Sequence, residues 1–305
     1  MMTNDNDLNL NEKVRNASRS IIESDIIVIA AGAGMSSESG IDDYYHGIDK
    51  AHPLLSQMGL SLFDISNHSL FEVNPSLAWG HWITRQRNYL SIEPHYGYHI
   101  VYHWKKSLRK QIRILTTNLD RQFARIGFEK NEIFEMHGSM YDVQCLEECG
   151  VQPWPIAIEE MGDVDDKTML ALGELPRCIQ CQGRTRVCTS LAVDGHWYAP
   201  HVQLVQQFHR QFFEQLSNEK KLTILEIGCG TVMNKVREEA RRLIDEHRCR
   251  GGHATFIRIN LYEAQLESRH QQNISLPLSA LQALTLINDQ IQTRTFPMST
   301  SNSVN

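Results

Sequence analysis

Five short runs with apolar centres stand out along the chain, at residues 26–31, 112–115, 132–135, 222–227 and 255–259. Each is followed within a few positions by glycine or asparagine, which is typical of buried parallel strands that feed a turn. Helical periodicity covers residues 11–23, 233–247 and 277–291, and residues 1–10 are expected to be frayed. Strands that alternate with helices predict an α/β fold, a doubly wound parallel sheet of the Rossmann-like type.

Two segments break this rhythm. Residues 41–108 are rich in aromatic residues and histidine and predict a helical insertion, whose aromatic residues, Phe71, Trp79 and Trp82 among them, should pack in a core. Residues 139–200 hold five of the seven cysteines and predict a metal-binding module. The Rossmann-like domain is then formed by residues 11–40, 109–138 and 201–295. The Ser/Asn-rich tail at 296–305 is expected to be disordered.

Composition narrows the function only slightly. With 41% hydrophobic and 22% charged residues, the chain is an ordinary globular one. A net charge of −6 disfavours nucleic-acid binding through the phosphate backbone and suits basic, lysine-bearing partners. No apolar run reaches the ~18 residues of a membrane span. The polar N-terminus lacks the features of a signal peptide, so we expect a cytoplasmic protein with reduced cysteines.

A glycine turn follows the first predicted strand. Gly32, Ala33, Gly34 and Ser36 lie where backbone amides could approach a diphosphate, ahead of a helix start. The dinucleotide fingerprint G-x-G-x-x-G is incomplete, because Ser37 occupies the third glycine position. A plain tight turn is the alternative interpretation.

Two cysteine pairs have the spacing of a zinc site. Cys145 and Cys149 form C-x3-C, and Cys178 and Cys181 form C-x2-C. Four thiolates suit tetrahedral zinc and leave no open coordination position, so the metal should be structural. The three other cysteines are expected in the core or in a pocket wall; they are Cys188, Cys229 and Cys249.

Polar residues follow two further strands. Asn118 and Asp120 come after one, and His137 comes after the next. A histidine at the mouth of a cleft can act as a general base near neutral pH. With fourteen histidines in the chain, His137 alone is weak evidence.

In this order, the segments resemble the sirtuin family, from about residue 23 to 260. The C-x3-C pair and the G-x-G-T segment at 228–231 are similar to those of its bacterial branch. The matching segments are 32–36 (G-A-G-M-S), 39–45 (S-G-I-D-D-Y-Y), 116–120 (T-T-N-L-D), 137–138 (H-G), the cysteine pairs, 228–231 (G-C-G-T) and 259–260 (I-N).

The resemblance implies a sirtuin fold, one structural zinc ion, NAD as cofactor and an acylated lysine as substrate. Asp120 would bind the nicotinamide carboxamide, Asn118 would act at the ribose, and His137 would be the general base. The products would be free lysine, nicotinamide and O-acyl-ADP-ribose. Cofactor positions implied in the same way are Gly32, Ala33, Gly34, Ser36, Asp43, Tyr44, Gly228, Cys229, Gly230, Thr231 and Asn260.

Two departures from the family keep other functions open. Tyr45 stands where the family has an arginine, and the segment 193–197 has the glycine of the substrate-binding loop without its phenylalanine. An altered loop at 42–45 would suit water or another acceptor, as in an NAD glycohydrolase or ADP-ribosyltransferase. The third alternative is a non-catalytic, NAD-sensing interaction protein.

Overall fold

Six parallel strands form the large sheet of the computed structural model. The structure describes residues 4–41, 54, 57–190, 207, 211–212, 216–232, 234–266 and 270–295. The strand order is β11-β10-β9-β1-β2-β3, and every neighbouring pair is parallel. The predicted α/β fold is therefore confirmed. The strands are β1 (Ile26–Ala31), β2 (Gln111–Thr116), β3 (Ile133–Glu135), β9 (Leu222–Ile227), β10 (Ala254–Ile259) and β11 (Asn273–Leu276).

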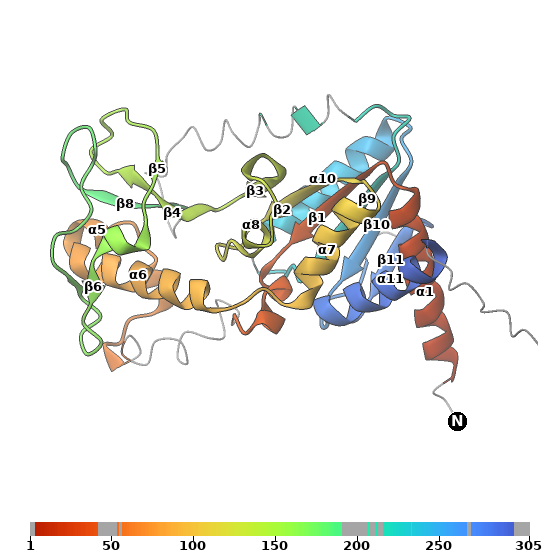
Figure 1. The fold of residues 1–305 in the computed structure, drawn as a ribbon, viewed down its shortest axis with the longest axis horizontal. Helices are drawn as coiled ribbons and strands as arrows, with labels where there is room; N and C mark the ends of the chain where they lie inside the picture. The colour runs from red at the N-terminus through yellow and green to blue at the C-terminus, as the bar shows by residue number, and fades with distance from the viewer. Residues whose placement is uncertain are drawn as a thin grey trace, which may run out of the picture.

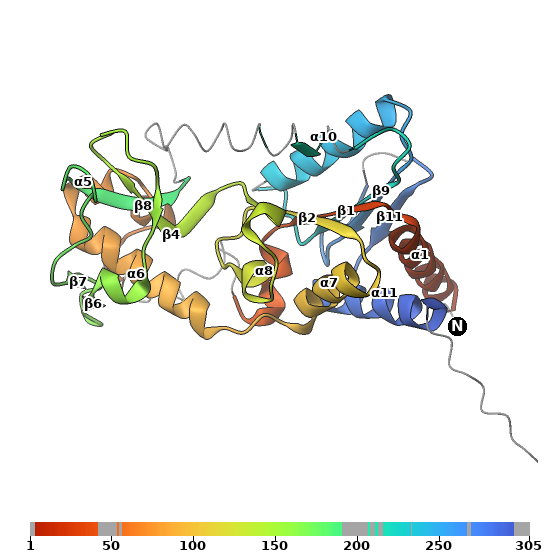
Figure 2. The same cartoon turned by 45° about the horizontal axis from the view of Figure 1, so that its top comes forward.

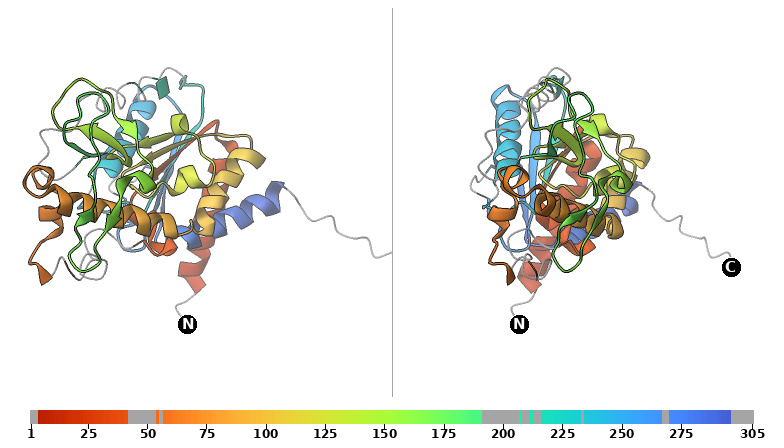
Figure 3. Two further views of the ribbon diagram at one scale, coloured as in Figure 1. Left: turned by 60° about the vertical axis from the view of Figure 1, so that its left-hand side comes forward. Right: turned by 90° about the vertical axis from the view of Figure 1, so that its left-hand side faces the viewer.

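Helices cover both faces of this sheet, because the central strands are apolar on both sides. In β1, Ile27 and Ile29 face a core formed with α1 (Asn4–Glu23), α7 (Tyr96–Ser107) and α11 (Ala280–Thr295). Ile26 and Val28 face the opposite core, which α10 (Lys235–Cys249) covers. Figures 2 and 3 show α10 on one side of the sheet and the other three helices on the other.

The direction in which successive strands are added to the sheet reverses between β1 and β9. From β1 the chain proceeds to β2 and β3 on one side, and from β9 to β10 and β11 on the other. The carboxyl ends of the strands point toward a smaller body, at the left of Figure 1. This reversal is the topological switch point, where open α/β sheets leave a crevice for ligands.

The smaller body has its own core. Phe71, Trp79 and Trp82 are at most 1% exposed and pack with Met140 and Val187, which confirms their predicted burial. Residues from both predicted insertions thus share one core. Its elements are α4 (Leu62–Ile65), α5 (Leu70–Val73), α6 (Pro75–Ser91), β4 (Gly138–Cys145), β5 (Trp154–Pro155), η4 (Ile158–Met161), β6 (Asp163–Val164), β7 (Ala171–Leu172) and β8 (Thr185–Thr189).

Some elements differ from the sequence prediction. Helix α7 packs on the large sheet through Tyr98 and Trp104, so residues 41–108 do not form a single inserted unit. Helix α1 begins at Asn4 rather than near residue 11, because extending a helix already packed through Val14 costs little per residue. The edge strand β11 was not predicted. The tail at 296–305 lies outside the described residues.

Among the helices of the described part of the chain, none combines the length and apolar character needed to span a bilayer.

Candidate functional site

Two glycine loops meet at the switch point, backbone against backbone. The Gly34 amide donates to the Gly228 carbonyl oxygen at 2.9 Å. A Cβ on Gly34 would lie 2.7 Å from the Gly228 Cα, and one on Gly228 would lie 2.3 Å from the Gly34 carbonyl carbon. Gly228 also has a φ of +61°, in the left-handed region that favours glycine. These two positions therefore have no space for a side chain.

This contact changes the interpretation of the glycine turn. The Gly32 amide donates to the Ile227 carbonyl oxygen at 2.9 Å, and the Ser36 amide donates to the Ala33 carbonyl oxygen at 3.0 Å. Together with Gly34, these amides are engaged within the protein. The glycines thus serve first to join the loops after β1 and β9, and so to form the floor of the crevice.

A polar network lies beside this floor, buried at Ser36 and Asp120 and partly buried at Asn118. The Asn118 side-chain amide donates to the Gly32 carbonyl oxygen and to the Ser36 hydroxyl, both at 2.9 Å. The Ser36 hydroxyl donates to the Asp120 carboxylate and lies 3.0 Å from the Tyr98 hydroxyl. Segments that are far apart in sequence therefore converge through one serine.

Asp120 is the charged member of this network and is only 4% exposed. Burial raises the pKa of its carboxyl group, while hydrogen bonds from the Ser36 hydroxyl and the Gln122 backbone amide oppose that rise. Burial, and then the nearby Asp120 charge, raise the pKa of Tyr98 well above its ordinary value. The tyrosine hydroxyl therefore stays protonated in this site.

His137 lies two residues after Glu135, the last residue of β3. The histidine is 9% exposed, and its carbonyl oxygen accepts a hydrogen bond from the Ser190 amide at 2.8 Å. Burial raises the pKa of Glu135 from 4.5 to about 7. A carboxyl group whose pKa lies near 7 and the His137 imidazole thus lie close together in sequence at the end of β3. The general-base role of His137 stays a prediction.

Hydrogen bonds and buried ion pairs hold the loop after β9 in place. The Cys229 carbonyl oxygen accepts hydrogen bonds from the Asn260 side-chain amide at 2.9 Å and from the Arg237 guanidinium at 2.5 Å. Glu226, 1% exposed, pairs with Arg258 at 2.7 Å and with Arg237 at 3.5 Å. The buried Glu226 carboxylate thus positions Arg237, which donates to the same carbonyl oxygen as Asn260.

The outer part of this loop is exposed. A Cβ on Gly230 would have no atom of the described residues within 4 Å, and the Thr231 hydroxyl donates to Glu263 at 2.8 Å. Cys229 itself is 1% exposed, in agreement with its predicted place in the core or in a pocket wall. Cys188 is also buried, whereas Cys249 is exposed in the last turn of α10, so the prediction for Cys249 was wrong.

The four predicted metal ligands converge in the smaller body. Their sulfur atoms all lie within 4.8 Å of one another, with Cys145 and Cys181 at 3.6 Å and Cys149 and Cys178 at 3.5 Å. Tetrahedral zinc with Zn–S bonds of about 2.3 Å requires sulfur separations of about 3.8 Å. Backbone amides of residues 147, 180 and 183 donate to these sulfurs at 3.3–3.4 Å. The cluster fits one structural zinc ion.

Comparison with known proteins identifies the family. The sequence model of the Sir2 family matches residues 32–232, well over half of the 305 residues. The chain belongs to the Sir2 family. The resemblance drawn from the motifs is thereby confirmed. A solved Sir2 homologue in complex with NAD superposes with a TM-score of 0.63 at 17% identity, over 91% of this chain and 93% of the other, and shows the same fold.

Relatives of this Sir2-family chain carry two kinds of name. The NAD-dependent protein deacylase 4 of Pseudomonas syringae pv. tomato is 29% identical over 52% of this chain and 57% of its own length. The protein ADP-ribosyltransferase of Staphylococcus aureus is 28% identical over 72% of this chain and 71% of its own. A probable bifunctional ADP-ribose hydrolase/ADP-ribosyltransferase of Fusarium oxysporum f. sp. cubense is 27% identical, and the chain covers 36% of it.

Some predicted positions of this Sir2-family chain lie outside the described residues. They include Asp43, Tyr44 and the departure at Tyr45, together with segment 193–197. Conversely, sequence reasoning missed Tyr98. Its only sequence signal is its place on the apolar face of a helix, which predicts burial but no contact with Ser36.

Proposed function

We propose that this Sir2-family chain is an NAD-dependent protein lysine deacylase. The observation that carries the proposal is the hydrogen-bond network of the buried Ser36 and Asp120 with the partly buried Asn118 at the switch point. It lies beside a glycine floor with no room for side chains, which suits a dinucleotide laid across the strand ends. His137 at the neighbouring strand end adds the base that the reaction needs.

The roles of the residues follow from their hydrogen bonds. Both amide hydrogens of Asn118 are bound within the protein, so its side-chain oxygen is the group that can accept a hydrogen bond from a ribose hydroxyl. Asp120 would accept from the nicotinamide carboxamide. When bound, NAD supplies the ADP-ribosyl group that takes up the acyl group as nicotinamide leaves. A ring nitrogen of His137 would take the proton of a ribose hydroxyl.

Burial supports this chemistry. Asp120 at 4% and His137 at 9% exposure are largely shielded from water, and fixed polar groups act more strongly in such an environment. The same shielding would limit hydrolysis of the activated sugar. We also infer a cytoplasmic location, because four zinc-binding thiols need a reducing compartment.

A second candidate function is ADP-ribosyl transfer, or hydrolysis of NAD. It is favoured by the Staphylococcus aureus match, which covers 72% of this chain and 71% of a protein named as an ADP-ribosyltransferase. The two functions share the cofactor crevice and differ in the acceptor. An acyl-lysine peptide is obligatory for the first and dispensable for the second.

The test is mass spectrometry of nicotinamide and O-acyl-ADP-ribose after incubation with NAD and a library of acyl-lysine peptides. His137→Ala should abolish product formation, and His99→Ala, a change on the exposed face of α7, should leave it intact. Equal turnover by wild type and His137→Ala would refute the role of His137. A folded, zinc-loaded wild type without any product would favour the non-catalytic alternative.

A further inference from the structure

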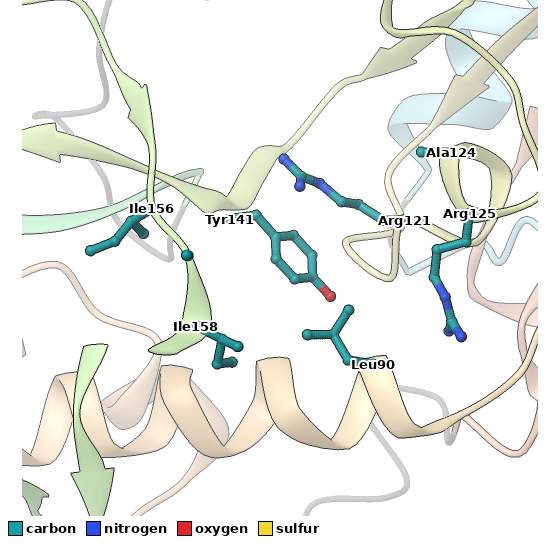
Figure 4. Close-up of a pocket in the computed structure, with 8 residues that line it drawn as sticks. Leu90, Arg121, Ala124, Arg125, Tyr141, Ile156 and Ile158 are labelled. Atoms are coloured by element: carbon teal, nitrogen blue, oxygen red, sulfur yellow. The ribbon is translucent and has the colours of Figure 1, made fainter. Parts of the chain in front are cut away.

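A second pocket lies between the smaller body and the large sheet, and Figure 4 shows its lining. It is a partly open cleft of about 390 Å³, within the ~300–1,000 Å³ of small-molecule sites. Leu90 at the end of α6, with Ile156 and Ile158 in the segment after β5, form an apolar wall. Of the residues predicted for NAD, catalysis or zinc, none that the structure describes lines this cleft.

One polar side chain in the pocket is buried without a partner. Tyr141 of β4 is 6% exposed, and among the described residues no group hydrogen-bonds to its hydroxyl. Figure 4 shows this hydroxyl directed into the cleft, past Leu90. Burial raises the pKa of Tyr141, so the hydroxyl stays protonated and offers a hydrogen-bond donor. Buried donors are rarely left unsatisfied in native proteins, so this donor calls for an acceptor from a ligand.

Two guanidinium groups belong to the lining of the same pocket. Arg121 stacks on the Tyr141 ring at 4.3 Å from its centroid, and Arg125 is the last residue of α8 (Gln122–Arg125). Arg121 is 3.7 Å from Asp142, and Arg125 is 2.9 Å from Glu93, whose side chain is 84% exposed. The guanidinium groups also donate to neutral acceptors, Arg121 to the Ser139 hydroxyl and Arg125 to the Tyr89 and Ile92 carbonyl oxygens. Among the described residues that line the pocket, the charged ones are these two arginines, so its charged lining is cationic.

We propose that this pocket binds a short aliphatic carboxylate, which accepts the Tyr141 hydroxyl hydrogen while its chain packs on the apolar wall. The donor selects an oxygen acceptor, and the two arginines of the lining favour a charged one. The wall provides burial for a few methylene groups, each worth about fourfold in affinity. A neutral amide of equal length would keep the apolar contact and lose the charge.

Such a ligand would bridge parts of the two bodies. Leu90 and Tyr141 belong to the smaller body, and α8 follows β2 of the large sheet. Arg121 directly follows Asp120 in the chain, so this part of the pocket is covalently linked to the candidate site. Because the ligand would contact both bodies, its binding is expected to raise the melting temperature of the whole protein.

The experiment is calorimetric titration of the zinc-loaded full chain with sodium hexanoate at neutral pH, with hexanamide as the uncharged probe. Hexanoate should bind saturably and more tightly than hexanamide. Tyr141→Phe, which removes only the hydroxyl, should weaken hexanoate binding by roughly 10- to 100-fold, as expected for one hydrogen bond to a charged group. The control Tyr96→Phe, at a tyrosine that is 61% exposed, should leave binding unchanged.

A second variant covers the case in which Tyr141→Phe perturbs folding. Leu90 is 39% exposed, so Leu90→Asp should fold, and it should abolish hexanoate binding by placing a like charge on the apolar wall. Binding should persist at saturating NAD. Absence of saturable binding, binding unaffected by either variant, or displacement by NAD would each overturn the proposal. This readout is independent of deacylase activity, so the two proposals can fail separately.

Discussion

The contact between the two glycine loops makes a sharp prediction for Gly228→Ala. At this position an added Cβ would lie 2.3 Å from the Gly34 carbonyl carbon and 2.4 Å from the Met35 amide nitrogen. Both are backbone atoms, which cannot rotate away as a flexible side chain could. The φ of +61° adds the cost of a left-handed conformation.

The two costs can be estimated separately. A left-handed backbone costs a residue with a Cβ about 1–2 kcal/mol. Overpacking a well-packed site typically costs ~1–3 kcal/mol more. The expected loss in the free energy of unfolding is therefore roughly 2–5 kcal/mol, or several degrees in melting temperature for a chain of this size.

Two other glycines supply matched controls. Gly251 has a φ of +81° and open space around its Cβ position, so Gly251→Ala should show only the conformational cost. Gly230, two residues from Gly228, has open space and no positive φ, so Gly230→Ala should be nearly neutral. Unfolding of the three variants in guanidinium chloride ranks their stabilities by the denaturant concentration at the midpoint of each transition. If Gly228→Ala is no less stable than Gly251→Ala, the backbone contact is refuted.

Three further predictions concern the metal, a titrating group and the buried network. Cys145→Ser should abolish the binding of one zinc per chain in metal analysis, while Cys249→Ser, outside the cluster, should retain it. Glu135 has a folded-state pKa raised to about 7, so it stabilises the protein most below pH 4.5. The free energy of unfolding should then fall by up to about 3 kcal/mol as the pH rises to 7, and Glu135→Gln should flatten this dependence. Asp120→Asn, which alters the acceptor of the Ser36 hydroxyl, should lower nicotinamide release by about tenfold or more. Unchanged release with an unchanged melting temperature would contradict a role for Asp120.

The sheet could be predicted because its strands are buried on both faces. Every residue of β1, β9 and β10 is buried, so each strand appears in the sequence as a short apolar run with a glycine or asparagine after it. Strand β11 has four residues, of which only Leu276 is buried, and carries no comparable signal. Strand ends could be predicted as a site because parallel strands share one carboxyl edge.

The rest of the site depends on tertiary packing. Tyr98 meets Ser36 only because α7 packs across the sheet, 62 positions along the chain. The pocket beside Tyr141 is assembled from α6, α8, β4 and the segment after β5, and no local pattern connects them. Cys249 was predicted to be buried because cysteine has low polarity. The residue is exposed because it lies in the last turn of α10.

The central claim is that NAD is cleaved in step with deacylation of lysine. The most direct measurement is the ratio of nicotinamide to deacylated peptide formed by the zinc-loaded protein, with a no-peptide reaction run in parallel. A deacylase gives one nicotinamide for each lysine freed, accompanied by O-acyl-ADP-ribose, and releases almost none without peptide. Nicotinamide release that is equal with and without acyl-lysine peptide would contradict the account and favour ADP-ribosyl transfer or NAD hydrolysis.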